Sequence, residues 1–352
     1  MKPQIPKKAL IIRFRRVGDA VLAVSLCSSL KKTFPGICID YVLNENIAPL
    51  FEGHPHIDKV ITFDDEENHN VRKYLSKVRR IMRETHYDII IDMRATIKTL
   101  FFSLFSLSTP FRIGTKKKYN ALLLNHRVAG DTGKSDVVQY DLTYLSPLEK
   151  IAPVCYDSIF RLYASNEEQI ACRTYMEEQG IDFSRKIVLV TPATRIQGKN
   201  WDIGRMREVI HRMIEKYHPQ IIFNYSGEAE QQICNDLYDQ LGRNPDIFIN
   251  INAKTLKELK TLISLCDFFF GNEGGPRHIA QALNIPAFAI YPPGASKHSW
   301  LPGNDNRFQG ISYEDIQPSV NLEHTTREEL FDLITADRVW AALDNMLNTH
   351  LK

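Results

Sequence analysis

Short apolar runs alternate with amphipathic stretches along the first half of the chain. The run KALIIR (8–13) predicts a strand followed by a polar loop, and residues 18–35 then carry apolar side chains at helical spacing up to a proline. Further strands are predicted for CIDYVLN, KVITF and DIIIDM, with an amphipathic helix over 71–87 before the last of them. Strands that alternate with helices indicate a parallel sheet covered by helices on both faces.

The same pattern starts again at KIVLVTP (186–192), after a predicted helix over 166–180. Predicted strands QIIFNYS, DIFIN, DFFFGN and PAFAIYP follow, separated by helical stretches. The sequence therefore predicts an α/β protein with two Rossmann-like, doubly wound domains, residues 1–165 and residues 166–334. We expect the last helix, within 335–352, to pack back on the first domain.

Polar loops follow several of the predicted strands. They are RFRRVGDA in the first domain and TPATRIQGKNW, YSGEAEQ and GNEGGPRH in the second. Ligands of doubly wound sheets bind where such loops gather, at the carboxyl ends of the strands. We therefore expect these loops to line a central cleft between two facing domains.

Composition narrows the class of protein. The chain has 352 residues, of which 43% are hydrophobic and 24% charged, and this is typical of a soluble protein with two domains. A formal net charge of +2 gives no indication of a nucleic-acid partner. The six cysteines form no C-x-x-C pair and are typical of reduced residues in a cytoplasmic protein. No apolar stretch approaches the roughly 20 residues that span a bilayer.

The loop GNEGGPRH is typical of an anion site. Gly274 and Gly275 let backbone N–H groups approach an anion, and Pro276 suits the first turn of a helix with a partly positive N-terminus. Arg277 or His278 could add positive charge. The alternative is a tight strand-to-helix turn in which the glycines serve only the backbone geometry.

Two further loops carry candidate charges. Lys199, with Thr194 on the same loop, is suited to a phosphate, although an isolated lysine is more often a solvated surface residue. Asp19 lies at or beside a helix N-terminus, so it is either an N-cap or a general base. In the second case Arg15 and Arg16 would hold an anionic co-substrate.

Two charge runs have alternative interpretations. The acids of FDDEEN (63–68) could hold a magnesium ion, or they could belong to a solvated turn. Between Arg94 and Ser135 there are eight Lys or Arg residues and one acid, Asp131, interleaved with apolar runs. This stretch could lie against an anionic membrane surface or bind a phosphorylated amphiphile, or it could be a solvated face.

Several of these segments together resemble the bacterial heptosyltransferases, glycosyltransferase family 9. The similar segments are, in the same order as in that family, the stretch from KALIIRFRRVGDAV to KVITF, DIIIDMRATIKT, FRIGTKKKY, TPATRIQGKNWDI, YSGEAEQQ and FFFGNEGGPRHIAQALNIPAFAIYPP. The resemblance covers roughly residues 8–300. It implies the GT-B fold and transfer of heptose from an ADP-sugar to the lipopolysaccharide inner core.

The resemblance also implies roles for individual residues. Asp19 would be the catalytic base, Lys199 would contact the donor phosphate and Glu230 the donor ribose, while Arg94 and Lys98 lie in the segment that faces the acceptor. Glu273 and Gly274 depart from the Asp-Thr pair that the family commonly has, which leaves the donor sugar open. RFRR replaces a loop that is often serine-rich, which indicates either a more anionic acceptor or a different one.

The resulting hypothesis is an inverting glycosyltransferase that needs no metal or other cofactor. Its partners would be ADP-heptose, an anionic glycolipid acceptor and, transiently, the inner-membrane surface, with no nucleic acid, so we expect a cytoplasmic protein peripheral to the inner membrane. Two alternatives remain: a GT-B transferase for another nucleotide-sugar, and a non-catalytic nucleotide-binding scaffold.

Overall fold

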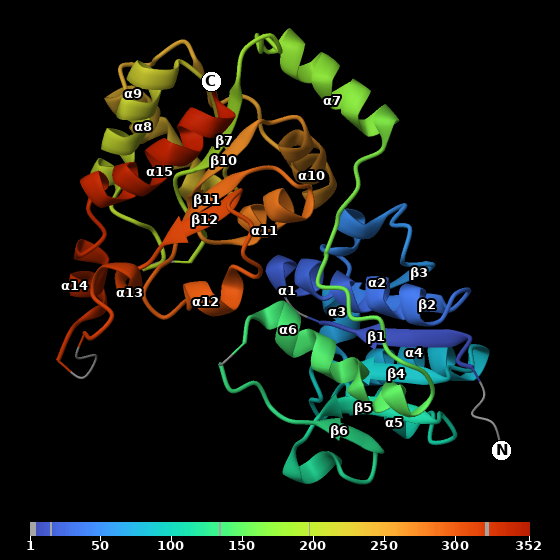
Figure 1. The fold of residues 1–352 in the computed structure, drawn as a ribbon. Coiled ribbons are helices and arrows are strands. Elements are labelled where there is room, and N and C mark those ends of the chain that lie inside the picture. Colours follow the sequence, from blue (N-terminus) through green and yellow to red (C-terminus); the bar gives the residue numbers. More distant parts are fainter. Residues whose placement is uncertain (1–4, 15, 134, 197, 321–323) are drawn as a thin grey trace. The chain divides into compact units, whose positions relative to one another are not determined.

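The computed structural model describes residues 5–14, 16–133, 135–196, 198–320 and 324–352. Its strands form two six-stranded sheets, ordered β3-β2-β1-β4-β5-β6 and β12-β11-β10-β7-β8-β9, and all strand pairs are parallel (Figure 1). Each order is that of a dinucleotide-binding Rossmann sheet. The predicted α/β class with two Rossmann-like domains is therefore confirmed.

The chain divides between Tyr163 and Ala164, two residues from the predicted boundary at 165. The first domain contains β1 (Lys8–Ile12), α1 (Val17–Leu22), α2 (Val24–Thr33), β2 (Cys38–Asn44), β3 (Lys59–Phe63), α3 (Asp65–His69), α4 (Val71–Glu84), β4 (Ile89–Asp92), α5 (Leu100–Leu104), β5 (Phe111–Thr115), β6 (His126–Val128) and α6 (Val137–Leu142). Three 3-10 helices, η1 (Ala48–Phe51), η2 (Lys118–Asn120) and η3 (Thr143–Lys150), complete it.

The second domain has the same alternation. It contains α7 (Asn166–Glu178), β7 (Ile187–Thr191), α8 (Ile203–Tyr217), β8 (Gln220–Phe223), α9 (Glu228–Gln240), β9 (Ile247–Phe248), α10 (Leu256–Ser264), β10 (Phe268–Asn272), α11 (Gly275–Ala282), β11 (Ala287–Ile290), α12 (Lys297–Trp300), β12 (Phe308–Ile311), α13 (Tyr313–Ile316), α14 (Arg327–Asp332) and α15 (Ala336–His350).

Side chains alternate between the two faces of the first sheet. Leu10 and Ile12 of β1 pack with Tyr74 and Val78 of α4 on one face, because successive strand residues point to opposite sides. On the other face, the hydroxyl of Tyr41 in β2 donates a hydrogen bond to the carbonyl of Ala20 in α1 at 2.9 Å. Helices thus cover both faces of the sheet, so its polar loops emerge only at the strand ends.

The last helix, α15, belongs to the second domain, which corrects the expectation that residues 335–352 pack back on the first. Val339, Leu343 and Leu347 of α15 are fully buried in the same core as β7 and α8. Lys216 of α8 also forms an ion pair with Asp344, at 2.7 Å. The apolar stripe of α15 therefore closes over α8, where it completes the core of the second sheet (Figure 1).

The described residues include no helix that is long and apolar enough to cross a membrane. All six cysteines are free, and Cys38 and Cys155 are exposed. Cys27, Cys234 and Cys266 are buried.

Candidate active site

In each sheet the chain winds outward in two directions from a central pair of strands. That pair is β1 and β4 in the first domain and β7 and β10 in the second. Such a switch point leaves a crevice at the carboxyl ends of the central strands, where doubly wound proteins bind ligands. The loops after these four strands contain most of the residues that the sequence singled out.

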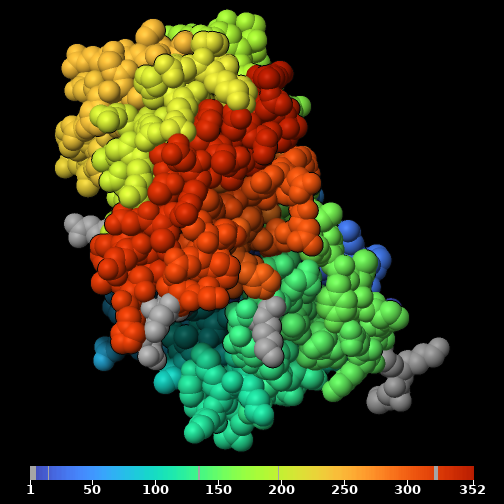
Figure 2. Space-filling model, turned by 60° about the vertical axis from the view of Figure 1, so that its left-hand side comes forward, coloured from blue at the N-terminus to red at the C-terminus, as the bar shows by residue number. Residues whose placement is uncertain are grey.

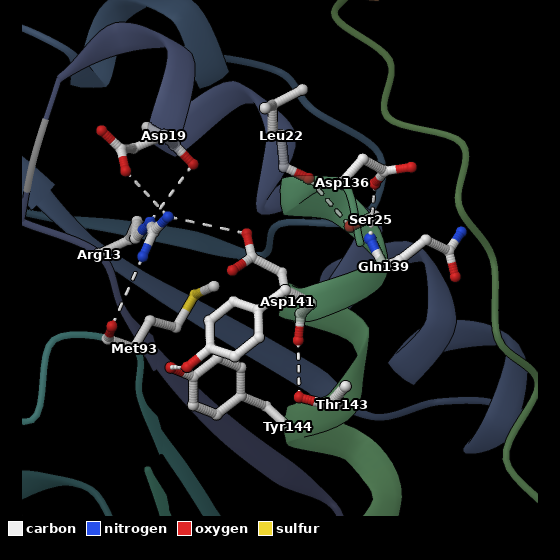
Figure 3. A network of polar contacts seen from close by, with 12 residues as sticks. Arg13, Asp19, Leu22, Ser25, Met93, Asp136, Gln139, Asp141, Thr143 and Tyr144 are labelled. Carbon is white, nitrogen blue, oxygen red and sulfur yellow. Dashed lines mark hydrogen bonds and ion pairs between the residues drawn. The ribbon is translucent and has the colours of Figure 1, made fainter. Parts of the chain in front are cut away.

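Asp19 lies in the first turn of α1, beyond the carboxyl end of β1, and is 5% exposed. Arg16 is the N-cap of α1 and makes no side-chain capping bond, so the alternative in which Asp19 caps this helix is wrong. The Asp19 carboxylate instead accepts a hydrogen bond from Nη2 of Arg13 at 2.9 Å. Figure 3 shows that one carboxylate oxygen faces Arg13 and that the other points away from it.

The four basic residues expected to bind an acceptor have different surroundings. Arg16 is exposed and Arg94 is half-buried, while Arg15 lies outside the described residues. Lys98 donates a hydrogen bond to the main-chain carbonyl of Asn68, and its ammonium group lies 4.3 Å from the centre of the Tyr74 ring. Burial lowers the pKa of Lys98. Arg16 and Arg94 are thus better placed than Lys98 to meet a ligand from solvent.

Part of the basic stretch after Arg94 holds loops together. Arg112 is buried and donates to the main-chain carbonyls of Leu107, Thr109 and Leu123 at 2.6–2.8 Å. Lys117 donates to the carbonyl of Arg94 at 3.0 Å. These two cations stabilise the fold, whereas Lys116, Lys118 and Arg127 remain exposed.

The acids of FDDEEN have local structural roles. Asp64 caps α3 by accepting from the backbone N–H of Glu67 at 2.7 Å, and the Glu67 side chain accepts from the backbone N–H of Asp64. Glu66 and Glu67 form ion pairs with Lys73 and Lys77. Within the part of the chain that the structure describes, no group of three or more His, Cys, Asp or Glu side chains could hold a metal.

In the second domain, Asn272 fixes the loop after β7. Its side-chain oxygen accepts from the backbone N–H of Trp201 at 2.9 Å, and its side-chain nitrogen donates to the carbonyl of Pro192 at 2.8 Å. Thr194 is held by a hydrogen bond from its N–H to the side chain of Asn200, at 2.6 Å. These hydrogen bonds hold described residues on both sides of Lys199, which lies near the central strands β7 and β10. Sequence reasoning missed Asn272 because it concentrated on the neighbouring glycines.

Lys199 and Glu273 meet across the two central strands of this sheet. The ammonium nitrogen of Lys199 lies 3.9 Å from Oε2 of Glu273, and Oε1 of Glu273 lies 3.5 Å from His278. Burial acts to raise the pKa of Glu273, but His278, Arg277 and Lys199 together hold it below its usual value. Glu273 is therefore a carboxylate at neutral pH, and it keeps Lys199 near the strand ends with only a loose contact.

The glycines of GNEGGPRH differ in their roles. Gly271 has φ +152°, and a Cβ there would come within 2.2 Å of the hydroxyl of Thr191, so only glycine fits between β10 and β7. Gly274 has extended backbone, and a Cβ there would meet only the Pro276 ring, at 3.8 Å. Backbone geometry does not explain Gly274, which argues against the tight-turn alternative at this position. A bare backbone before α11 leaves room for a ligand.

Arg277 and His278 point into the domain, which corrects the expectation that one of them adds charge at the loop. Arg277 is fully buried and donates to the side chain of Gln281 and to the carbonyl of Trp300. Burial and the charge of Arg277 lower the pKa of His278 to about 4, so this imidazole is neutral at pH 7. The positive charge available to a ligand at the loop after β10 therefore comes from the Lys199 side chain and from the N-terminus of α11.

Glu230 lies in the first turn of α9, after β8, which neighbours β7. It is 7% exposed and accepts from the backbone N–H of Ser226 at 2.9 Å. Burial raises the pKa of Glu230, and Arg195 opposes that rise. The loops after β7, β8 and β10 thus bring a lysine, a buried acid and a helix N-terminus to one edge of the sheet.

Two Rossmann-like domains, each with polar loops at the switch point of its sheet, are the domains of the GT-B fold, and comparison with known proteins identifies the family. The model of glycosyltransferase family 9 (heptosyltransferase) matches residues 75–331. The chain belongs to that family, and it is a glycosyltransferase.

Similar proteins match this chain over nearly the whole length of both sequences. Lipopolysaccharide heptosyltransferase 3 of Escherichia coli is 23% identical over 94% of this chain and 96% of its own. Lipopolysaccharide core heptosyltransferase OpsX of Haemophilus influenzae is 24% identical over 96% and 91%. Among solved structures, a family 9 glycosyl transferase from Veillonella parvula superposes with a TM-score of 0.82 at 17% identity, covering 97% of this chain and 98% of that one.

A fourth comparison supports the same fold. The structure of ADP-heptose lps heptosyltransferase II from E. coli superposes with a TM-score of 0.72 at 21% identity, over 97% of this chain and 99% of its own. The GT-B fold predicted from the sequence is therefore confirmed.

Proposed function

We propose that this enzyme transfers heptose from ADP-heptose to an anionic acceptor in the lipopolysaccharide inner core, with inversion at the anomeric carbon and without a metal ion. The names of its relatives support the sugar and the acceptor. A heptosyltransferase from E. coli with a TM-score of 0.67 was solved with ADP-2-deoxy-2-fluoro heptose, which supports the donor. The observation that carries the proposal is an Arg-held acid, Asp19, in one domain and a loosely paired Lys199 in the other.

The acceptor hydroxyl oxygen attacks the anomeric carbon of the donor. As that C–O bond forms, Asp19 takes the hydroxyl proton, and the bond from the anomeric carbon to the diphosphate oxygen breaks with its electron pair on the leaving group. Lys199 and the backbone N–H groups at the start of α11 stabilise the negative charge of that diphosphate. Attack from the side opposite the leaving group inverts the anomeric carbon.

The donor site discriminates between the proposed function and its two alternatives. The departures at Glu273 and Gly274 favour a test of other nucleotide-sugars, because both residues lie where the diphosphate is expected. We expect ADP and ADP-heptose to raise the melting temperature more than GDP, UDP or their sugars, with and without EDTA. Stabilisation by UDP or GDP would favour another transferase, and stabilisation by no nucleotide would favour a scaffold. Loss of heptose transfer in EDTA would contradict metal independence.

Contact with an anionic membrane is the proposed route to the acceptor. Ile97 is 71% exposed and Leu122 is 92% exposed, and both lie in the stretch that carries the exposed cations Lys116, Lys118 and Arg127. Figure 2 shows this stretch, in teal to green, on the surface of the first domain. Exposed apolar side chains interleaved with cations favour binding to acidic headgroups.

We expect the protein to sediment with vesicles that contain phosphatidylglycerol and much less with vesicles of phosphatidylcholine alone. Leu122→Asp should reduce that binding at least severalfold, because it removes an apolar contact and adds a repelled charge. Ile170→Asp is the matched control, since Ile170 is 66% exposed on α7 of the second domain. Equal binding by both variants would contradict the proposed membrane face.

A further inference from the structure

The guanidinium group of Arg13 donates hydrogen bonds to two segments of the first domain. Arg13 follows β1 and is 7% exposed. Its Nη2 donates to Oδ1 of Asp19 at 2.9 Å, its Nε donates to the Asp19 carbonyl at 3.4 Å, and its Nη1 donates to the carbonyl of Met93, after β4, at 3.5 Å (Figure 3). Arg13 therefore fixes both the position of Asp19 and the direction of one of its carboxylate oxygens.

A second carboxylate lies on another side of the same guanidinium. Asp141 of α6 is fully buried, and its Oδ2 lies 3.8 Å from Nη2 of Arg13. Among the described residues, neither carboxylate oxygen of Asp141 has a hydrogen-bond partner. One buried guanidinium thus stands between two buried carboxylates, as Figure 3 shows.

Neither helix capping nor hydrogen bonding explains Asp141. Asp136 caps α6, by accepting from the backbone N–H of Gln139 at 2.8 Å. An asparagine or an apolar residue at position 141 would avoid burying a charge without hydrogen bonds. Buried charges that lower stability are expected at functional sites.

We propose that Asp141 is a positioning residue that acts through Arg13 to keep the carboxylate of Asp19 basic. The inference rests on the proposed role of Asp19 as the general base. If Arg13 faced Asp19 alone, its full positive charge would favour the unprotonated form and weaken Asp19 as a proton acceptor. The negative charge of Asp141 offsets that charge while Arg13 keeps its orienting hydrogen bonds. Asp141 itself forms and breaks no bond.

The pKa of Asp141 gives this arrangement a pH dependence. Burial raises this pKa to about 7, Arg13 opposes the rise and Asp19 adds to it. The titratable and charged groups around Asp141 are Arg13 after β1, Asp19 on α1, Tyr41 on β2, Tyr144 on η3, Asp131 before α6 and Asp136 at its N-cap. Below about pH 7, Asp141 takes up a proton and no longer offsets the charge of Arg13. The full charge of Arg13 then acts on Asp19, and sugar transfer should slow.

Kinetics of Asp141→Asn test the proposal. At pH 8 we expect kcat to fall about three- to tenfold, because a general base that meets the full charge of Arg13 accepts the acceptor proton less readily. The deficit should shrink towards pH 6, where the wild-type Asp141 is itself protonated, and KM for both substrates should stay within about twofold. A variant with the wild-type pH profile, or one with an equal loss at every pH, would overturn the proposal.

Asp136→Asn is the matched control, because it removes the same charge from the same helix and asparagine can still cap it. We expect its pH profile to follow that of the wild-type protein with at most a small shift to lower pH, because Asp136 is the weakest of the groups that act on the pKa of Asp141. A deficit in Asp136→Asn that grew with pH, as large as that of Asp141→Asn, would show a general charge effect and overturn the proposal.

Thermal unfolding supplies a readout that does not depend on catalysis. An unfolded aspartate titrates near pH 4, so the cost of the Asp141 charge is absent below that pH, grows between about pH 4 and 7, and is complete above 7. Relative to wild type, Asp141→Asn should gain melting temperature from pH 5 to pH 8. A difference in melting temperature that does not change with pH, or a variant that cannot fold, would contradict the conclusion that the buried charge of Asp141 lowers stability.

Asp19→Asn separates failure of this inference from failure of the proposed function. If Asp19→Asn is inactive while Asp141→Asn keeps the wild-type profile, only the role of Asp141 is lost. If Asp19→Asn retains turnover, the general base is another group, and the role of Asp141 falls with that of Asp19.

Discussion

Asp19→Asn should lower kcat for sugar transfer by about 10²- to 10⁴-fold, the contribution of a positioned general base. Asparagine has nearly the shape of aspartate and can still accept a hydrogen bond from Arg13, but it cannot take the acceptor proton. ADP affinity should stay near that of the wild-type protein, because the proposed donor residues all lie in the second domain. Steady-state kinetics and calorimetry with ADP measure the two quantities.

Asp65→Asn provides the control for this variant. Asp65 is an exposed acid in the first turn of α3, in the same domain. It should leave kcat unchanged. Wild-type turnover by Asp19→Asn would remove Asp19 from the mechanism, and a large loss of ADP affinity would place it in donor binding instead.

Lys199→Ala should weaken ADP binding by about 10- to 100-fold. Hydrogen bonds to charged groups contribute about 1.5–3 kcal/mol, and each 1.4 kcal/mol is a factor of about ten in affinity. The ammonium group is only loosely paired with Glu273, at 3.9 Å, and its side chain is 26% exposed, so it is available to a phosphate. Calorimetry at two salt concentrations measures the affinity, and the salt dependence should be weaker in the variant.

Lys254→Ala is the matched control, since Lys254 is an exposed lysine of the same domain outside the loops after β7, β8 and β10. It should bind ADP as the wild-type protein does. If Lys199→Ala also bound ADP unchanged, Lys199 would be a surface lysine with no part in donor binding.

The central strands of the two sheets could be predicted from the sequence because they are buried, whereas the partly exposed strands β5, β6 and β12 were not predicted. Residues 187–191 and 268–272 are buried throughout, as a parallel strand covered on both faces requires. The apolar stripe of α15 was equally clear in the sequence, yet it was assigned to the wrong domain. An amphipathic pattern shows which face of a helix is covered, but not which sheet covers it.

The individual site residues were harder to predict, for a related reason. Sequence reasoning selected Asp19 and Lys199 from their loops but missed Asp141, because its partner Arg13 is 128 positions away and only the packing of α6 brings them together. Arg277 and His278 were expected to face a ligand, whereas both side chains point into the domain. Loop composition indicates where a site lies, and side-chain direction depends on packing that the local sequence does not specify.

A crystal structure with ADP-2-deoxy-2-fluoro heptose bound tests the central claim most directly. The account predicts that diphosphate oxygens lie within about 3.2 Å of the Lys199 ammonium nitrogen and of backbone N–H groups in the first turn of α11. The ribose should lie beside Glu230. A diphosphate bound away from the loops after β7 and β10, with Lys199 still paired to Glu273, would contradict the account.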